Sequence, residues 1–142
     1  MNIIAGSILV ILAVTGAIHA LWALRIWWPI ADEEALARAV VGAKGITRMP
    51  SAMMTWVVVV AIVLGILWTM ALSGWIALPL PDWMVTGGGL LMAAVLLVRG
   101  IGTYFAGLFG MKAEEPFSTL NARYYSPVII LLGVGTLLTA VM

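Results

Sequence analysis

Four long apolar runs, separated by short polar segments, constrain the fold of this chain more than any other feature. They occupy residues 3–28, 51–72, 84–110 and 123–142. About 20 apolar residues in a helix cross the ~30 Å hydrocarbon core of a bilayer, so each run is long enough to span it. Only 9% of the residues are charged, against roughly 25% in soluble domains. The sequence therefore predicts an all-α integral membrane protein, a four-transmembrane-helix bundle forming one domain over residues 1–142.

The segment 29–50, between the first two spans, has the pattern of a short amphipathic helix. Asp32 is a typical N-cap residue, acidic residues follow it directly, and basic residues come late, as the helix dipole favours. We therefore expect a short interfacial helix that lies along the membrane surface. The alternative is a solvated loop with one helical turn, because the apolar face of the segment is small and rich in alanine.

Two local patterns concern the beginnings of the third and fourth spans. Gly87, Gly88 and Gly89 lie in the first turns of the third span, and small residues let a neighbouring helix approach closely in lipid. We interpret the three glycines as a packing notch. Ser126 followed by Pro127 has the pattern of an N-cap with proline at the first helical position, which predicts a helix start there.

Basic residues are distributed asymmetrically between the two ends of the spans. Six of the seven lie at one set of ends, and the segments at the opposite ends carry none; the six are Arg25, Arg38, Lys44, Arg48, Lys112 and Arg123. Lys and Arg concentrate in cytoplasmic loops, which predicts that loops 29–50 and 111–122 are cytoplasmic and that both termini lie outside. The basic residues form no stripe of the kind that nucleic-acid binding requires, so we expect no nucleic-acid partner.

Arg99, the seventh basic residue, lies within the third span. It is ~24 Å along the helix from Trp83 at the outer edge, and therefore only ~6 Å short of the inner edge of the hydrocarbon core. One interpretation is that its side chain snorkels to that edge or contacts a neighbouring helix. The other is a binding site for a ligand or lipid headgroup, because a base without an intramembrane acid favours an anionic partner.

His19, the one histidine of the chain, lies within the first span. Residues three or four positions apart share a helix face, so His19 is adjacent to Thr15 and Trp22. One interpretation is a neutral imidazole hydrogen-bonded to a neighbouring helix, and the other is a ligand-binding or proton-handling role. Haem or metal ligation would require a methionine, a second subunit or an open site to complete the coordination, and we expect neither a cofactor nor a metal.

Further polar residues gather near the inner edge of the membrane. These residues are Thr103, Tyr104, Asn121 and Tyr124, and together with Arg99 they predict a shallow cytoplasmic pocket. Tyr124 also fits the pattern of an interfacial aromatic anchor. The spans contain no Asp or Glu, and the chain has no cysteine. Neither the carboxylate relay of proton-coupled transporters nor a cysteine nucleophile is available, and we predict no catalytic residues.

Three short motifs carry a resemblance to a known family. They are His19-Ala20-Leu21-Trp22, Val98-Arg99-Gly100-Ile101-Gly102, and Phe117 followed by Tyr124-Tyr125-Ser126-Pro127. Nearly the whole chain resembles an uncharacterised family of small bacterial membrane proteins, the domain of unknown function 3995. The resemblance implies a four-helix protein of the bacterial inner membrane with no established activity. The family pattern has acidic residues where this chain has Thr103 and Asn121, so the carboxylates that would pair with Arg99 are missing.

The leading hypothesis is a small, non-catalytic membrane protein that binds an anionic lipid or small amphiphile, or acts as an accessory subunit. The proposed ligand-binding residues are Arg99, His19, Trp22, Thr103, Asn121 and Tyr124. One alternative is an oligomeric small transporter or channel, because four short spans alone enclose little pathway. The other is a membrane-embedded enzyme that uses His19 as an acid or base, for which we find no second catalytic group. The expected partners are membrane lipids, with further copies of the chain in a homo-oligomer or a larger membrane complex.

Overall fold

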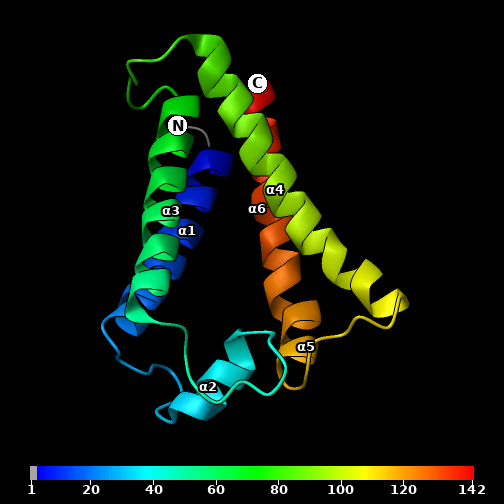
Figure 1. Cartoon of the computed structure of the whole chain (residues 1–142). Coiled ribbons are helices and arrows are strands. Elements are labelled where there is room, and N and C mark those ends of the chain that lie inside the picture. Colours follow the sequence, from blue (N-terminus) through cyan, green and yellow to red (C-terminus); the bar gives the residue numbers. More distant parts are fainter. Residues whose placement is uncertain (1–2) are drawn as a thin grey trace.

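In the computed structural model, which describes residues 3–142, four long helical stretches run between the two ends of the molecule (Figure 1). Each is long and apolar enough to cross a membrane, which confirms the predicted all-α integral membrane fold. In chain order the elements are α1 (Ile3–Ala23), α2 (Glu33–Val40), α3 (Ala52–Leu72), α4 (Asp82–Leu108), α5 (Phe117–Leu120), the π-helical segment η1 (Asn121–Tyr125) and α6 (Ser126–Val141). The predicted spans 51–72 and 84–110 agree with α3 and α4 to within two residues at each end.

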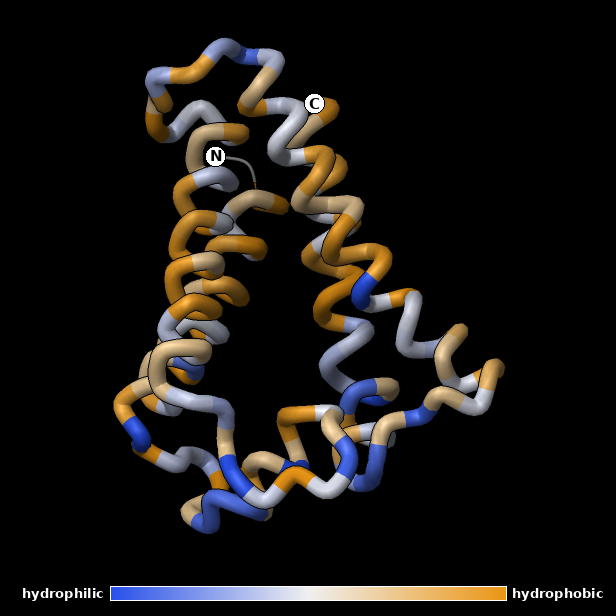
Figure 2. Tube along the Cα trace, in the orientation of Figure 1, coloured by the Kyte–Doolittle hydropathy of each residue, from blue (hydrophilic) through white to orange (hydrophobic). Residues whose placement is uncertain are grey.

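The start of α1 and the end of α6 lie at the same end of the molecule, and α2 lies at the opposite end (Figure 1). We call these the terminal end and the α2 end. The long helices are apolar over most of their length, and hydrophilic residues concentrate at the α2 end (Figure 2).

The long helices pack as two pairs, α1 with α3 and α4 with α6. The pairs diverge toward the α2 end, so the arrangement is more open than the predicted bundle (Figure 1). Between the pairs, Ile8 and Leu12 of α1 form a buried apolar cluster with Leu132 of α6. Gly135 permits this approach, because a Cβ atom at that position would lie only 3.1 Å from the Ile8 side chain.

Glycines also allow α4 and α6 to pack at short distance. A Cβ atom at Gly100 would lie 2.6 Å from Cγ1 of Ile130 and 3.2 Å from the carbonyl oxygen of Ser126. A Cβ atom at Gly133 would lie 2.8 Å from Cγ of Leu97. At these two positions any side chain would push the helices apart.

The glycine triplet of α4 is a packing notch at two of its three positions. A Cβ atom at Gly88 would overlap the ring of Trp68, whose Nε1 donates a hydrogen bond to the Val85 carbonyl at 2.9 Å. A Cβ atom at Gly89 would lie 2.7 Å from the Leu72 side chain. The prediction is confirmed for Gly88 and Gly89, whereas Gly87 has nothing within 4 Å of its Cβ position.

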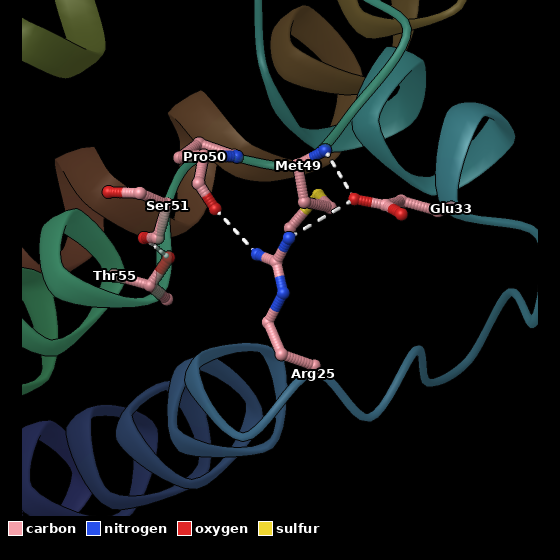
Figure 3. Close-up of polar contacts among 6 residues, drawn as sticks. All are labelled: Arg25, Glu33, Met49, Pro50, Ser51 and Thr55. Atoms are coloured by element: carbon pink, nitrogen blue, oxygen red, sulfur yellow. Dashed lines mark hydrogen bonds and ion pairs between the residues drawn. The ribbon is translucent and has the colours of Figure 1, made fainter.

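Arg25 ends the first span earlier than the predicted residue 28. Its backbone is left-handed (φ 62°), and the Arg25 and Ile26 amides donate to the Trp22 and Leu21 carbonyls, as in a Schellman cap. The Arg25 guanidinium donates to the Pro50 carbonyl at 2.8 Å and contacts the Glu33 carboxylate at 3.5 Å (Figure 3). The same Glu33 oxygen accepts a hydrogen bond from the Met49 amide at 3.1 Å. One side chain therefore joins the end of α1 to the beginnings of α2 and α3.

The left-handed backbone of Arg25 leads to a prediction about two substitutions. Arg25→Ala and Arg25→Gly both remove the guanidinium contacts, but only alanine retains the steric cost of a left-handed conformation, about 1 kcal/mol. We expect both variants to be less stable than wild type and the alanine variant to be the less stable of the two by about that amount. Unfolding of the full chain in mixed micelles measures the difference. Equal stabilities of the two variants would contradict the prediction.

The predicted interfacial helix is present as α2, and the alternative of a solvated loop is wrong. Asp32 caps it, accepting a hydrogen bond from the Ala35 amide at 2.7 Å. Its apolar face packs against protein, because Leu36 and Ala37 are buried in a cluster with Trp22 and Met49.

The last turn of α2 and the residues after it contact the second helix pair. The Tyr125 hydroxyl donates to the Ala39 carbonyl at 3.1 Å, and the Gly45 amide donates to the Glu114 carboxylate at 2.9 Å. The ring of Phe117 packs so close to Gly42 that a Cβ atom there would lie 2.7 Å from it. These contacts hold the α2 end together where the long helices have diverged.

The α-helix α6 begins at Ser126 with Pro127 in its first turn, as the Ser-Pro pattern predicted, but the predicted N-cap role of Ser126 is wrong. The fourth stretch already begins at Phe117, and Ser126 lies inside it, with its amide bonded to the Asn121 carbonyl five residues back. Proline has no amide hydrogen, and its ring crowds the carbonyl four residues before it. The helix accommodates Pro127 by widening into the π-helical turn η1 immediately before it.

Candidate functional site

A pocket of about 760 Å³ lies at the α2 end of the second helix pair. Its walls come from the last turns of α4, the connection 109–116, α5 and η1, with Gly42 contributing from the α2 side. Three of the predicted site residues line it: Arg99, Thr103 and Asn121. The structure therefore brings these three residues of the second helix pair together in one pocket.

A hydrogen-bond network holds the Arg99 side chain. Its Nη1 donates to Thr103 Oγ1 at 3.0 Å and its Nη2 donates to Asn121 Oδ1 at 3.2 Å. Asn121 Nδ2 in turn donates to Thr103 Oγ1 at 3.0 Å, which occupies both lone pairs of that hydroxyl. The Ser126 hydroxyl lies 2.9 Å from Thr103 Oγ1 and 3.3 Å from Asn121 Oδ1. Since Thr103 is fully used as an acceptor, we assign the Ser126 proton to Asn121.

Local geometry explains why these side chains meet. Arg99 and Thr103 are four residues apart on α4, so they share a helix face. Asn121 and Ser126 are five residues apart across η1, and a π-helical turn brings residues at that spacing to the same side. Asn121 is 6% exposed and Ser126 is fully buried. The π-helical turn imposed by Pro127 thus positions the two neutral partners that face α4.

The network contains no carboxylate, which determines its electrostatic character. Within residues 3–142 the ion pairs are Arg25 with Glu33 and Arg38 with Glu34, so Arg99 has no acidic partner. Its guanidinium carries five N–H donors, of which the network uses two. The site therefore offers an oriented positive charge with donors still available to an anion.

A second base and an apolar rim complete the pocket. The Lys112 side chain folds back along α4, with its Cε 3.5 Å from where a Cβ atom would be at Gly107. Val98, Leu108 and Met111 also line the pocket and are 73%, 80% and 68% exposed. The pocket is consequently basic within and apolar at its edge.

The family model described as Protein of unknown function (DUF3995) matches residues 12–136. The chain belongs to this family. The DUF3995 match contains all three sequence motifs that carried the resemblance, and it covers Arg99, Thr103 and Asn121. Comparison with curated proteins and with solved structures gives no match.

The structure brings two of these three sequence motifs to the pocket, whereas the third lies elsewhere. Arg99 and Gly102 come from the motif on α4, and Phe117 begins the motif that leads into α6. The motif containing His19 and Trp22 lies on α1, in the first helix pair, and neither residue lines the pocket.

His19 and Trp22 have partners of their own, away from Arg99. His19 Nδ1 lies 2.8 Å from the Thr15 carbonyl, which can only accept, so Nδ1 carries the proton. The His19 ring packs against the Trp22 ring with centroids 4.9 Å apart, and Trp22 Nε1 donates to the Trp28 carbonyl at 2.7 Å. The predicted membership of His19 and Trp22 in the Arg99 site therefore has no support in the geometry.

Tyr124 also lies outside the pocket. Its side chain is exposed, and the Arg123 guanidinium lies 5.5 Å from its ring centroid. Tyr104, by contrast, lines the pocket, and its hydroxyl donates to the Ala122 carbonyl at 2.7 Å, which links α4 to η1. This arrangement fits the interfacial-anchor interpretation of Tyr124.

Several residues of the site were not among those predicted from the sequence. Lys112, Glu115 and Gly102 line the pocket, and Ser126 belongs to its hydrogen-bond network. Ser126 did have a sequence signal, the proline that follows it, but that pattern is shared with helix starts. Within residues 3–142 no group of three or more His, Cys, Asp or Glu residues is placed to hold a metal ion.

Proposed function

We propose that this DUF3995 protein is a non-catalytic protein of the bacterial cytoplasmic membrane that binds an anionic lipid or small amphiphile in the Arg99 pocket. The observation that carries the proposal is the guanidinium of Arg99, which neutral side chains orient and no carboxylate neutralises. A planar guanidinium fork matches the oxygens of a phosphate or carboxylate group, so an anionic headgroup is the natural partner.

Energetics supports an anion at this position. An arginine in the hydrocarbon region raises the cost of membrane insertion by about 2.5–3.5 kcal/mol at the helix centre. Polar neighbours and a bound negative charge both offset that cost. Thr103 and Asn121 supply hydrogen bonds but no charge. An anionic ligand would supply the negative charge that the network lacks.

The pocket rim supports an amphiphile as the ligand. Val98, Leu108 and Met111 expose most of their apolar surface beside Arg99 and Lys112. An acyl chain would cover this rim, and its headgroup would reach the two bases.

The charge distribution supports a cytoplasmic location for the pocket. Lys44, Arg48 and Lys112 belong to the connections at the α2 end, whereas the connection between α3 and α4 contains no base. We infer that the α2 end faces the cytoplasm and the termini face outward.

Replacing Arg99 tests the proposal directly. We expect native mass spectrometry of the wild-type protein, extracted gently from its own membrane, to detect a retained anionic amphiphile. Arg99→Gln should retain at least about tenfold less, because a charge-assisted hydrogen bond to the headgroup is lost. Arg123→Gln is the matched control, since it removes the same charge from a residue outside the pocket.

Thermal unfolding of both variants shows whether each still folds. Equal retention by folded Arg99→Gln and Arg123→Gln would refute the binding site. A different polypeptide that copurifies with the protein, with no amphiphile, would instead favour the accessory-subunit role.

One observation favours a second candidate function, an oligomeric small transporter or channel. The two helix pairs diverge toward the α2 end, and such an arrangement is compatible with movement of one pair against the other (Figure 1). A liposome flux assay for protons, metal cations and organic cations distinguishes the two functions, because a binding protein gives no flux above that of empty liposomes.

A further inference from the structure

The pocket contains acceptors as well as bases, and a bare phosphate would leave them unused. Glu115, Ser118 and Thr119 line it beside Lys112. We propose, building on the proposed function, that the ligand is a phosphodiester lipid with hydroxyl groups on its headgroup, as in a glycerol phosphodiester. In this proposal Glu115 determines specificity by accepting a headgroup hydroxyl.

The position of Glu115 is fixed by its own hydrogen bond. Its Oε2 accepts from the Thr119 amide at 3.1 Å, so this oxygen is engaged and the other remains available as an acceptor. A carboxylate held in this way accepts a hydroxyl proton strongly, because charged acceptors form shorter and stronger hydrogen bonds than neutral ones. The neighbouring Glu114 differs, since it bonds to the Gly45 amide at 2.9 Å and does not line the pocket.

The charge balance of the lining favours a singly charged ligand. Arg99 and Lys112 contribute positive charges and Glu115 contributes one negative charge, which leaves one net positive charge. A phosphodiester carries one negative charge and matches it. A phosphomonoester carries up to two, and its second charge would meet the Glu115 carboxylate.

An ammonium group on the headgroup would also find an acceptor in Glu115, but the whole ligand would then be neutral. The net positive charge of the lining would then receive no counter-charge from the ligand. A hydroxyl donates to the carboxylate without cancelling the charge of the phosphodiester. The geometry and the charge balance together therefore favour the hydroxyl-bearing headgroup.

Lipid competition tests this specificity on the full chain in neutral detergent micelles. Phosphatidylglycerol, phosphatidic acid and phosphatidylethanolamine with identical acyl chains are added at equal concentrations, and bound lipid is read by native mass spectrometry. We expect phosphatidylglycerol to be preferred about tenfold over each of the others. Glu115→Gln should bind phosphatidic acid more tightly and lose most of that preference, whereas Glu114→Gln should keep it.

The outcomes separate this inference from the proposed function. Binding of none of the lipids by wild type overturns both. If phosphatidic acid or phosphatidylethanolamine binds as tightly as phosphatidylglycerol, the inference about headgroup specificity is wrong. The Arg99→Gln measurement then decides separately whether the pocket binds anionic lipids at all. Identical selectivity of the Glu115 and Glu114 variants overturns the role of Glu115. If water-soluble glycerophosphoglycerol binds as tightly as phosphatidylglycerol, the headgroup assignment is supported. The proposal that the ligand is an amphiphile is then wrong.

Discussion

Replacing Gly100 by alanine is expected to lower the free energy of unfolding by about 1–3 kcal/mol, the usual cost of forcing extra volume into a packed interface. The added methyl group would lie 2.6 Å from Cγ1 of Ile130 and 3.2 Å from both the Ile130 amide nitrogen and the Ser126 carbonyl oxygen. Ile130 can change its side-chain conformation, but the backbone of α6 cannot yield locally. The expected relief is a separation of α4 from α6 along this crossing.

Gly102 provides the matched control for this stability measurement. It lies on the same helix two residues further on, and a Cβ atom there would meet nothing within 4 Å. Gly102→Ala should therefore change stability by less than about 1 kcal/mol, or increase it through helix propensity. Unfolding of both variants in mixed micelles checks the pair. If Gly100→Ala unfolds at the same denaturant concentration as Gly102→Ala, the close crossing of α4 and α6 is wrong.

Replacing Gly102 by leucine is expected to lower retention of the amphiphile strongly while the protein stays folded. Gly102 lines the pocket beside Arg99 and Thr103, and the space at its Cβ position is open. A leucine side chain would enter the volume that the ligand needs, without contacting α6 and without removing a charge. Native mass spectrometry should show at least about a tenfold loss of retained ligand, comparable with Arg99→Gln.

The control for the leucine substitution is Gly87→Leu. Gly87 also lies on α4 with nothing within 4 Å of its Cβ position, and it does not line the pocket. The Gly87 variant should retain the ligand at the wild-type level. If the Gly102→Leu and Gly87→Leu variants retain equal amounts of ligand, the ligand does not bind in this pocket. That conclusion would hold whatever amount of ligand Arg99→Gln retains.

The Arg99-Gly100-Ile101-Gly102 motif thus contains two glycines with different roles. Gly100 faces α6 and has no room for a side chain, whereas Gly102 faces the pocket and keeps its volume open. The sequence presents them as equivalent small residues two positions apart. Only the packing of α6 against α4 distinguishes them.

The membrane-spanning helices and the short helix α2 were predictable because their signals are local. Hydropathy over about 20 residues determines whether a helix is stable in lipid, and Asp32 with its following acidic residues determines where α2 begins. The meeting of Arg99 with Thr103 follows from their spacing on one helix. Asn121 was expected near the inner edge of the membrane, in the loop before the fourth span, and in the structure its Oδ1 accepts a hydrogen bond from Arg99.

The depth of a residue in the membrane does not determine which residues at a similar depth contact one another. His19 was expected near Arg99, but α1 belongs to the other helix pair, and the pairs diverge toward the α2 end (Figure 1). A one-dimensional pattern gives the height of a residue along its own helix and carries no information about which helix lies opposite. That choice depends on shape, here on Gly100 and Gly133 joining α4 to α6.

The sequence by itself determined that this protein is helical and spans a membrane, and that Arg99 stands there without an acid, because apolar length and charge are properties of each residue. The tertiary structure decided which neutral groups surround Arg99. Pro127 widens the helix before it, and this turns Asn121 and Ser126 together toward α4. Whether these two side chains meet Arg99 depends on the position of α4, which the Ser-Pro pattern does not contain.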